Sequence, residues 1–266
     1  MATIAENLQT IIDIKADIKT AIENKGVDMT NTPFSEYSTK IDEITTGGGS
    51  GKIDIAATGI KFGNSTFTEI PDVFDFSNVT NMSNMFYLCA SLTTIPLLDT
   101  TNVTNMFGMF YNCTKLQSIP ELNTSNATSM GYMFFSCVSL TTIPLLDTTK
   151  VTDMTRMFYN CTKLQSIPLL ECGKVTNMDT IFGYSNIDTF TDLGGFKNLK
   201  ISVTSNFLDK TPNLTVDSLM NVINNVYDLT ANGLSGQSLC FGQTNLDKLT
   251  GEQIAVATAK GWTLTA

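Results

Sequence analysis

The sequence predicts an α/β repeat solenoid, and three observations lead to that prediction. Short motifs recur every 24 residues through the middle of the chain. Each repeat contains apolar patterns typical of one short helix and one brief strand. The segments on either side do not share the period. Units of this size cannot bury their apolar residues alone, so neighbours stack around one continuous core. We therefore expect a solenoid at residues 53–186, between an N-terminal α-helical module and an α/β C-terminal cap.

Two residue pairs define the period. A Met-Phe pair returns in 24-residue steps, with Ile in place of Met at the last step, and an Ile-Pro pair returns with it. Only the first Ile-Pro interval has an extra residue. A second period of 48 residues is superimposed, because residues 91–101 are identical to residues 139–149. This regularity predicts five stacked turns. The pairs are Met85-Phe86, Met109-Phe110, Met133-Phe134, Met157-Phe158 and Ile181-Phe182, and Ile70-Pro71, Ile95-Pro96, Ile119-Pro120, Ile143-Pro144 and Ile167-Pro168.

One repeat illustrates the expected local structure. Apolar residues at positions 106, 109, 110 and 113 have the spacing of one face of a short helix. Thr104 is the expected N-cap of that helix. Residues 116–120 then alternate like a brief strand and stop at a proline, which cannot donate to a ladder. Each turn is therefore expected to be one strand plus one short helix.

Residues 1–46 predict a helical module for attachment or oligomerisation. Apolar residues recur there at three- and four-residue steps between charged residues. They fit a heptad with isoleucine at core positions, which favours three or more strands and hence a homotrimer. The same pattern also fits a single helix that folds back on a second one beginning at Thr32-Pro33. The predicted oligomerisation residues are Ile4, Leu8, Ile11, Ile18 and Ile22.

Two segments flank the solenoid. Residues 47–52 are rich in glycine and predict a flexible linker. Residues 187–266 predict a capping segment, because the last turn of a stack needs an atypical unit to cover it. Within the cap we expect a helix from about Thr215, a strand at 238–242, a second helix opened by the capping box Thr250-Gly-Glu-Gln253, and a closing strand at 261–265.

Composition excludes several classes of function. The formal net charge is −9 with a pI near 4.4, and no basic stripe exists to neutralise phosphates, so we expect no nucleic-acid partner. No apolar run approaches the roughly 18 to 20 residues that span a bilayer, so no membrane insertion is expected. The first residues lack the pattern of a Sec leader. The chain contains no histidine, which removes most familiar catalytic and zinc sites. We expect no enzyme activity, no catalytic residues, no metal site and no cofactor.

Three polar or reactive columns recur with the repeat, and each favours a structural interpretation. One cysteine per turn is expected to be a reduced, buried hydrophobe, although stacking places neighbours within disulfide range on spacing alone. The acidic column is expected to form turns, with cation binding or acid-base catalysis as the weaker alternatives. The asparagines are expected to be caps and turn residues. The columns are Cys89, Cys113, Cys137 and Cys161; Asp75, Asp99, Asn123, Asp147 and Glu171; and Asn78, Asn102, Asn126, Asn81, Asn105 and Asn177.

An aromatic column is the candidate ligand site. It consists of Tyr87, Tyr111, Phe135 and Tyr159, each directly after a core phenylalanine. A ring in this place can have one apolar side and one wet side. One hypothesis is a binding stripe for a glycan or a surface protein. The alternative, that the rings merely stack on one another and cover the core, fits the same pattern and is favoured.

The repeated unit from Leu92 to Cys113 resembles the BspA-like class of leucine-rich repeats, which occurs in bacterial surface proteins, in mycoplasmas and in phages of gut bacteria. The resemblance spans about residues 67–183. It implies a leucine-rich-repeat solenoid used for adhesion or recognition. It does not imply a particular ligand.

A weaker resemblance concerns the N-terminal stretches 18–27 and 34–41, which are similar to short helical modules at the start of phage tail-fibre and other virion proteins. It implies a phage virion structural protein, a fibre or receptor-binding appendage. Such a protein would contact other virion proteins through residues 1–46 and a host surface protein or glycan through the solenoid. The alternative is a BspA-like adhesin on the bacterial cell surface, which an export signal in an upstream-extended reading frame would support.

Overall fold

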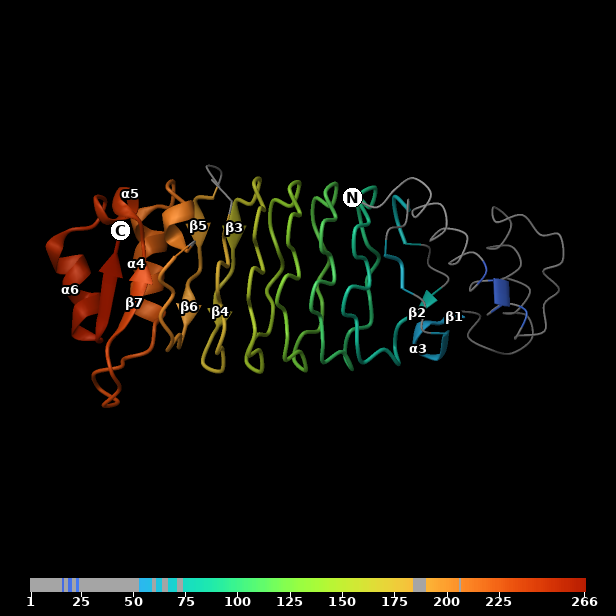
Figure 1. The fold of residues 1–266 in the computed structure, drawn as a ribbon, viewed down its shortest axis with the longest axis horizontal. Coiled ribbons are helices and arrows are strands. Elements are labelled where there is room, and N and C mark those ends of the chain that lie inside the picture. The colour runs from blue at the N-terminus through green and yellow to red at the C-terminus, as the bar shows by residue number, and fades with distance from the viewer. Residues whose placement is uncertain are drawn as a thin grey trace.

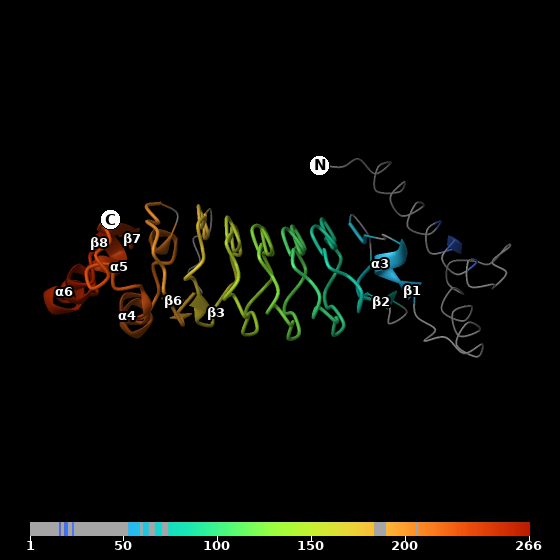
Figure 2. The same cartoon turned by 90° about the horizontal axis from the view of Figure 1, so that it is seen from below.

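The structure is a computed structural model, and it describes residues 53–58, 61–63, 67–70, 74–183, 190–205 and 207–266, together with Ala16, Lys19, Thr20 and Glu23. These residues form an elongated stack of turns with a group of helices and strands at its C-terminal end (Figures 1 and 2). No helix among them is long and apolar enough to cross a membrane. The solenoid predicted from the 24-residue period is confirmed.

Four residues of the predicted N-terminal module are described, and they are helical. Lys19 and Glu23 form an i,i+4 ion pair, with 3.7 Å between Nζ and Oε1. The linker at 47–52 lies outside the described residues. So do the predicted oligomerisation residues Ile4, Leu8, Ile11, Ile18 and Ile22. The coiled coil and the homotrimer therefore remain predictions.

The stack begins near residue 53. Strand β1 (Ile53–Asp54) pairs in parallel with β2 (Phe74–Asp75), and the short helix α3 (Ile55–Thr58) follows β1 directly. The N–H of Phe62 donates to the carbonyl of Met85 at 2.8 Å, which is the first in a long series of bonds between neighbouring repeats.

The short helix predicted in each repeat is wrong, because a run of turns occupies its place. The N–H groups of Met106 and Phe110 donate to carbonyls of the next repeat at 3.0 Å and 2.9 Å. The N–H of Met109 instead closes a turn on the carbonyl of Met106, at 3.2 Å. This alternation continues from repeat to repeat, so the segment forms a parallel ladder between turns. Isolated bridges along the ladder join Asn81, Asn105, Ser129, Asp153 and Asn177 in sequence.

Left-handed backbone at two positions of each repeat explains the absent helix. Gly108 has φ 60° and Asn112 has φ 58°, whereas an α-helix requires negative φ at every residue. Glycine and asparagine tolerate this conformation well. The column of Gly108 also holds Tyr132, Arg156 and Thr180, with φ of 59°, 51° and 51°. The turn is therefore imposed by the stack even where the residue disfavours it.

The brief strand predicted in each repeat is not a paired strand in most of the described turns, because strands pair only at the two ends of the stack, β1 with β2 at its start and two further pairs near its C-terminal end. Between these ends the neighbouring segments are joined by an isolated bridge between Thr142 and Ser166 and by single backbone hydrogen bonds such as that from Thr141 to Gln117. The stacked prolines contribute to this difference, because proline has no N–H to donate. The stack also extends past residue 186, where the cap is predicted to begin. The paired strands are β3 (Ser166–Ile167) with β5 (Asp192–Leu193) and β4 (Leu170–Glu171) with β6 (Phe196–Lys197), all parallel.

The core is a continuous column of side chains. Five phenylalanines, one per repeat, are fully buried, and neighbouring ring centroids lie 5.4–5.9 Å apart with nearly parallel planes. Each ring thus contacts the equivalent ring of the next repeat, so the stability of each repeat depends on its neighbours. The column is Phe86, Phe110, Phe134, Phe158 and Phe182.

The cysteine column lies beside this core and is reduced. All six cysteines are free and buried. The thiol of Cys113 donates to the carbonyl of Phe86 at 3.1 Å, and the other members repeat this bond. Burial raises the pKa of the Cys161 thiol to about 12. The interpretation of these residues as small buried hydrophobes is confirmed.

The C-terminal segment contains the elements predicted for it. Helix α4 (Val216–Asn225) is capped by Thr215, and α6 (Gly251–Ala259) opens with the capping box of Thr250 and Gln253. The two strands pair in parallel, and together these elements form the end of the stack (Figure 1). The remaining elements are the 3₁₀ helix η2 (Leu208–Lys210), β7 (Gln237–Cys240), α5 (Gln243–Leu246) and β8 (Trp262–Thr265).

Candidate functional site

The structure brings the predicted aromatic column together as a ladder. Ring centroids are 4.8 Å apart for Tyr87 and Tyr111, 4.4 Å for Tyr111 and Phe135, and 4.5 Å for Phe135 and Tyr159. The planes are within 26° of parallel, and all four side chains are half-buried. We call these four residues the aromatic ladder. Each lies one residue after a core phenylalanine, so the ladder runs beside the buried column and along the solenoid axis.

Close stacking decides which part of each ring a ligand can reach. The faces of Tyr111 and Phe135 are covered by their neighbours in the ladder, so these two rings cannot stack on a sugar or a peptide side chain. Their edges remain, and on the tyrosines the edge carries a hydroxyl group. The alternative favoured from the sequence, rings stacking on one another, is what the geometry shows. A binding role must therefore use ring edges and hydroxyls.

Glycine occupies the ladder position in the repeats at both ends. Gly63 precedes Tyr87 by 24 residues, and Gly183 follows Tyr159 by 24 residues. A Cβ atom on Gly183 would lie 2.8 Å from the Tyr159 ring, so that ring lies directly over the glycine backbone. The repeat beyond each end of the ladder therefore contributes no side chain to the row.

Three residues that the sequence analysis did not single out extend the ladder sideways. Tyr132 lies 5.6 Å from the Phe135 ring centroid, and Phe107 lies 5.1 Å from that of Tyr132. Arg156 donates from Nη1 to the Tyr132 hydroxyl at 2.9 Å and from Nε to the Thr180 hydroxyl at 3.0 Å. The signal was present, because Tyr132 and Arg156 are 24 residues apart and therefore adjacent in the stack.

The arginine adds a positive charge to an otherwise neutral aromatic surface. Its guanidinium carbon lies 5.6 Å from the centroid of Tyr132 and 5.9 Å from that of Tyr159, within the range of cation–π attraction. Both Arg156 and Tyr132 have left-handed backbone, which costs roughly 1–2 kcal/mol for a residue other than glycine. The turn that strains these residues also places both side chains against the ladder.

The Tyr111 phenol acts as a neutral hydrogen-bonding group. Burial raises the pKa of Tyr111, and the nearby Tyr87 and Tyr132 raise it further, while Arg156 lowers it. At neutral pH this hydroxyl stays protonated, so it can both donate and accept a hydrogen bond. The surface can therefore bind polar groups through hydroxyls and one guanidinium.

The acidic and asparagine columns form turns, as predicted. Asp99 accepts the N–H of Thr101 at 3.0 Å, and Asn105 accepts the N–H of Phe107 at 2.9 Å. The same bond two residues ahead recurs through the acidic column and at Asn81 and Asn177. The other three asparagines, Asn78, Asn102 and Asn126, instead donate from Nδ2 to the preceding turn. Within the described ranges no three His, Cys, Asp or Glu side chains gather as a metal site would require.

Comparison with known proteins places the chain in a family. The model of the family described as "Mycoplasma protein of unknown function, DUF285" matches three overlapping stretches, residues 60–142, 91–192 and 136–231, which together cover more than half of the sequence. The chain belongs to this family. The DUF285 matches include every residue of the aromatic ladder and the first helix of the C-terminal segment.

Two further comparisons complete the picture. No curated protein matches the sequence. Among solved structures, the chain is similar to a leucine-rich-repeat protein of T. pallidum, with 16% sequence identity, a TM-score of 0.48, and coverage of 74% of this chain and 86% of that one.

Proposed function

We propose that this protein is a non-enzymatic recognition protein whose solenoid binds a protein or a glycan along the aromatic ladder. The observation that carries the proposal is the continuous surface of half-buried rings, extended by Tyr132 and Arg156. Tyrosine and arginine are the residue types most enriched at binding hot spots. Stacking also fixes the rings before binding, which lowers the entropy lost on association.

We place this function on a phage virion, as a fibre or receptor-binding appendage. The support is the order of segments in the sequence: a predicted helical module, a glycine-rich spacer and a solenoid that resembles BspA-like leucine-rich repeats. Residues 1–46 would then bind other virion proteins and assemble as a homotrimer. The second candidate is an adhesin on the bacterial cell surface, and the family description, which names Mycoplasma, favours it.

The location of the protein, on a virion or on the bacterial cell surface, is tested by mass spectrometry of purified virions and of the envelope fraction of their host. The proposal expects peptides of this chain in the virions. Their absence from virions together with their presence in the envelope would replace the appendage with the adhesin.

The binding face is tested with a fluorescent form of the full chain on a glycan array and on intact bacterial cells. We expect the double variant Tyr111→Ala, Tyr159→Ala to lose binding by about tenfold or more, the scale of a hot-spot truncation. The exposed Lys115→Ala, in the same repeats, is the matched control and should bind normally. Unchanged binding by the double variant, with its thermal unfolding intact, would remove the ladder from the proposal.

A further inference from the structure

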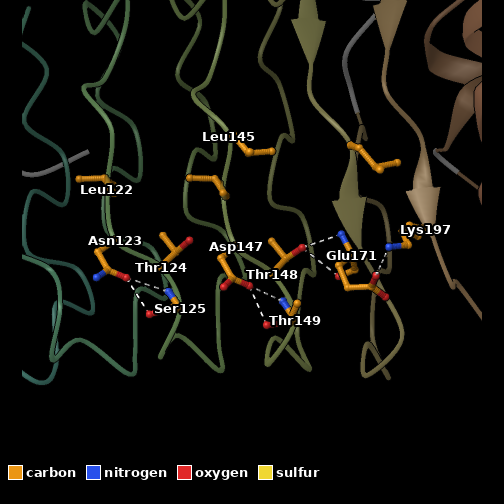
Figure 3. Close-up of a pocket in the computed structure, with 12 residues that line it drawn as sticks. Leu122, Asn123, Thr124, Ser125, Leu145, Asp147, Thr148, Thr149, Glu171 and Lys197 are labelled. Carbon is orange, nitrogen blue, oxygen red and sulfur yellow. Dashed lines mark hydrogen bonds and ion pairs between the residues drawn. The ribbon is translucent and has the colours of Figure 1, made fainter.

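A groove crosses four neighbouring turns of the stack. In the first three of them it lies just after the Ile-Pro pair, about ten residues further along the turn than the aromatic ladder. It encloses about 480 Å³. Leucines line its wall, and a row of short polar residues lines its opposite side (Figure 3). We call this feature the leucine groove. Its main lining residues are Leu122, Thr124, Leu145, Asp147, Glu171 and Lys197.

The wall of the groove holds an unusually exposed apolar side chain. Leu145 has 71% of its surface exposed, and its equivalent two repeats earlier, Leu97, has 77% exposed. Burying a leucine side chain is favourable, so an exposed one beside a hollow is available to a partner. The sequence carried the signal, because in Ile-Pro-Leu-Leu the second leucine is buried and the first therefore points outward.

The opposite side of the groove carries two carboxylates, Asp147 and Glu171. Both hydrogen bonds of Asp147 come from Thr149 and go to Oδ1 (Figure 3), and the residue is exposed. These bonds lower the pKa of Asp147, so it is ionised at neutral pH. The other carboxylate, Glu171, is paired with Lys197 at 3.6 Å. That pair shows that an ammonium group fits beside a carboxylate of this column.

The floor of the groove holds a buried hydroxyl without a hydrogen-bond partner. The Thr148 hydroxyl donates to the carbonyl of Glu171 at 2.9 Å and accepts its N–H at 2.7 Å. The equivalent hydroxyl of Thr124, in a residue 2% exposed, has no partner. In Figure 3 the Thr124 side chain points from its own turn towards the next one, as Thr148 does. The missing partner is thus of the kind that Thr148 has, a backbone peptide group.

The backbone is also open where the groove lies. Among the described residues, no backbone hydrogen bond joins 121–123 to 145–147, whereas the ladder on the other side of the turn continues without a break. A buried hydroxyl without a partner destabilises the fold, so a ligand group that supplies the missing bond would stabilise this face.

We propose that the leucine groove binds an extended peptide segment of a partner protein, one that carries a basic side chain next to an apolar one. The apolar side chain packs against Leu145, the basic one pairs with Asp147, and a peptide group bonds to the Thr124 hydroxyl. The charge of the protein, −9 overall, also favours a basic partner. The inference rests on the proposed recognition function but assigns it a second surface and a ligand class.

The test measures the Kd of the full chain for a labelled, end-capped peptide of about six alternating leucines and lysines, since an extended chain rises about 3.3 Å per residue and the repeats lie about 4.8 Å apart. Asp147→Asn, Leu145→Ala and Thr124→Val are each expected to weaken binding about tenfold, the effect of losing one such contact. Matched controls lie 48 residues earlier: Asp99 and Leu97 are not among the residues that line the leucine groove, so Asp99→Asn and Leu97→Ala should change the Kd less than about twofold. A peptide with glutamate for lysine should not bind.

Three results would overturn the inference: no binding of the leucine-lysine peptide, equal weakening in the variants and their controls, or loss of a dimer in Leu145→Ala by light scattering, which would make the groove a contact between copies. The ladder double variant should bind the peptide normally. A failure of the ladder proposal therefore leaves the groove result unaffected, and the two are distinguishable.

Discussion

At the scale of single residues, equivalent positions hold the same side chain in different surroundings. Thr100, Thr124 and Thr148 are all buried, but only the Thr148 hydroxyl has hydrogen-bond partners in the described chain. The repeats are therefore similar in sequence, but the equivalent threonine hydroxyl contributes differently to the stability of each. Repetition predicted that these threonines share a place. It could not predict which of them is satisfied, because that depends on how closely the next turn approaches.

Substituting valine for Thr148 and for Thr124 measures how much each hydroxyl contributes to the free energy of unfolding. Thr148→Val removes two hydrogen bonds and leaves a peptide group unpaired, so we expect a loss of about 1–3 kcal/mol of unfolding free energy. Thr124→Val removes a hydroxyl that has no partner, so stability should stay the same or rise. Urea unfolding of both variants gives the comparison. Equal losses would show that Thr124 is bonded after all.

The buried thiols make stability depend on alkaline pH. The pKa of Cys161 is raised to about 12 in the fold, against about 8.5 in an unfolded chain. Between these values the unfolded state loses a proton that the folded state keeps, so stability is full below about pH 8.5 and falls as pH rises towards 12.

Urea unfolding at intervals across that pH window checks this prediction. The slope contributed by Cys161 should approach about 1.4 kcal/mol per pH unit and should vanish in Cys161→Val. An unchanged slope in the variant would mean that other groups cause the alkaline loss.

At the scale of elements, the sequence predicted the C-terminal helices well and the repeat helices badly. Thr215 and Thr250 cap real helices, because each cap is followed by an uninterrupted helical stretch. In the repeats, apolar residues also recur at i, i+3, i+4 and i+7. This spacing does not distinguish a helix from consecutive turns that face one core. Gly108 and Asn112 were the available signs of left-handed turns, whereas Tyr132 and Arg156 gave none, since neither residue type favours that conformation.

Two substitutions of Asn112 separate a helix from a left-handed turn. In a helix alanine would stabilise relative to glycine by about 1 kcal/mol. In the turn observed here, φ is 58°, so the order reverses and Asn112→Gly should be more stable than Asn112→Ala by about 1 kcal/mol. Thermal unfolding of the pair decides between them. A more stable alanine variant would support the predicted helix and contradict the left-handed turn.

At the scale of the whole molecule, stacking creates both the core and the surfaces that we assign to binding. The 24-residue period places Tyr87, Tyr111, Phe135 and Tyr159 in one row, and that much of the site was predictable. The distance between repeats then brings the rings face to face, which no single repeat can show. The arginine contact and the leucine groove are likewise built from residues of different turns. The sequence held a sign of each, but only the stack shows their geometry.

The central claim is that this row recognises its ligand through ring edges and hydroxyls. The most direct measurement is the Kd of the double variant Tyr111→Phe, Tyr159→Phe for the ligand found on the array or on cells. Phenylalanine keeps the stacked rings and removes only the hydroxyls. We predict that affinity falls about tenfold, the effect of losing hydrogen bonds at an interface, with thermal unfolding unchanged. Full affinity in this variant would contradict the claim.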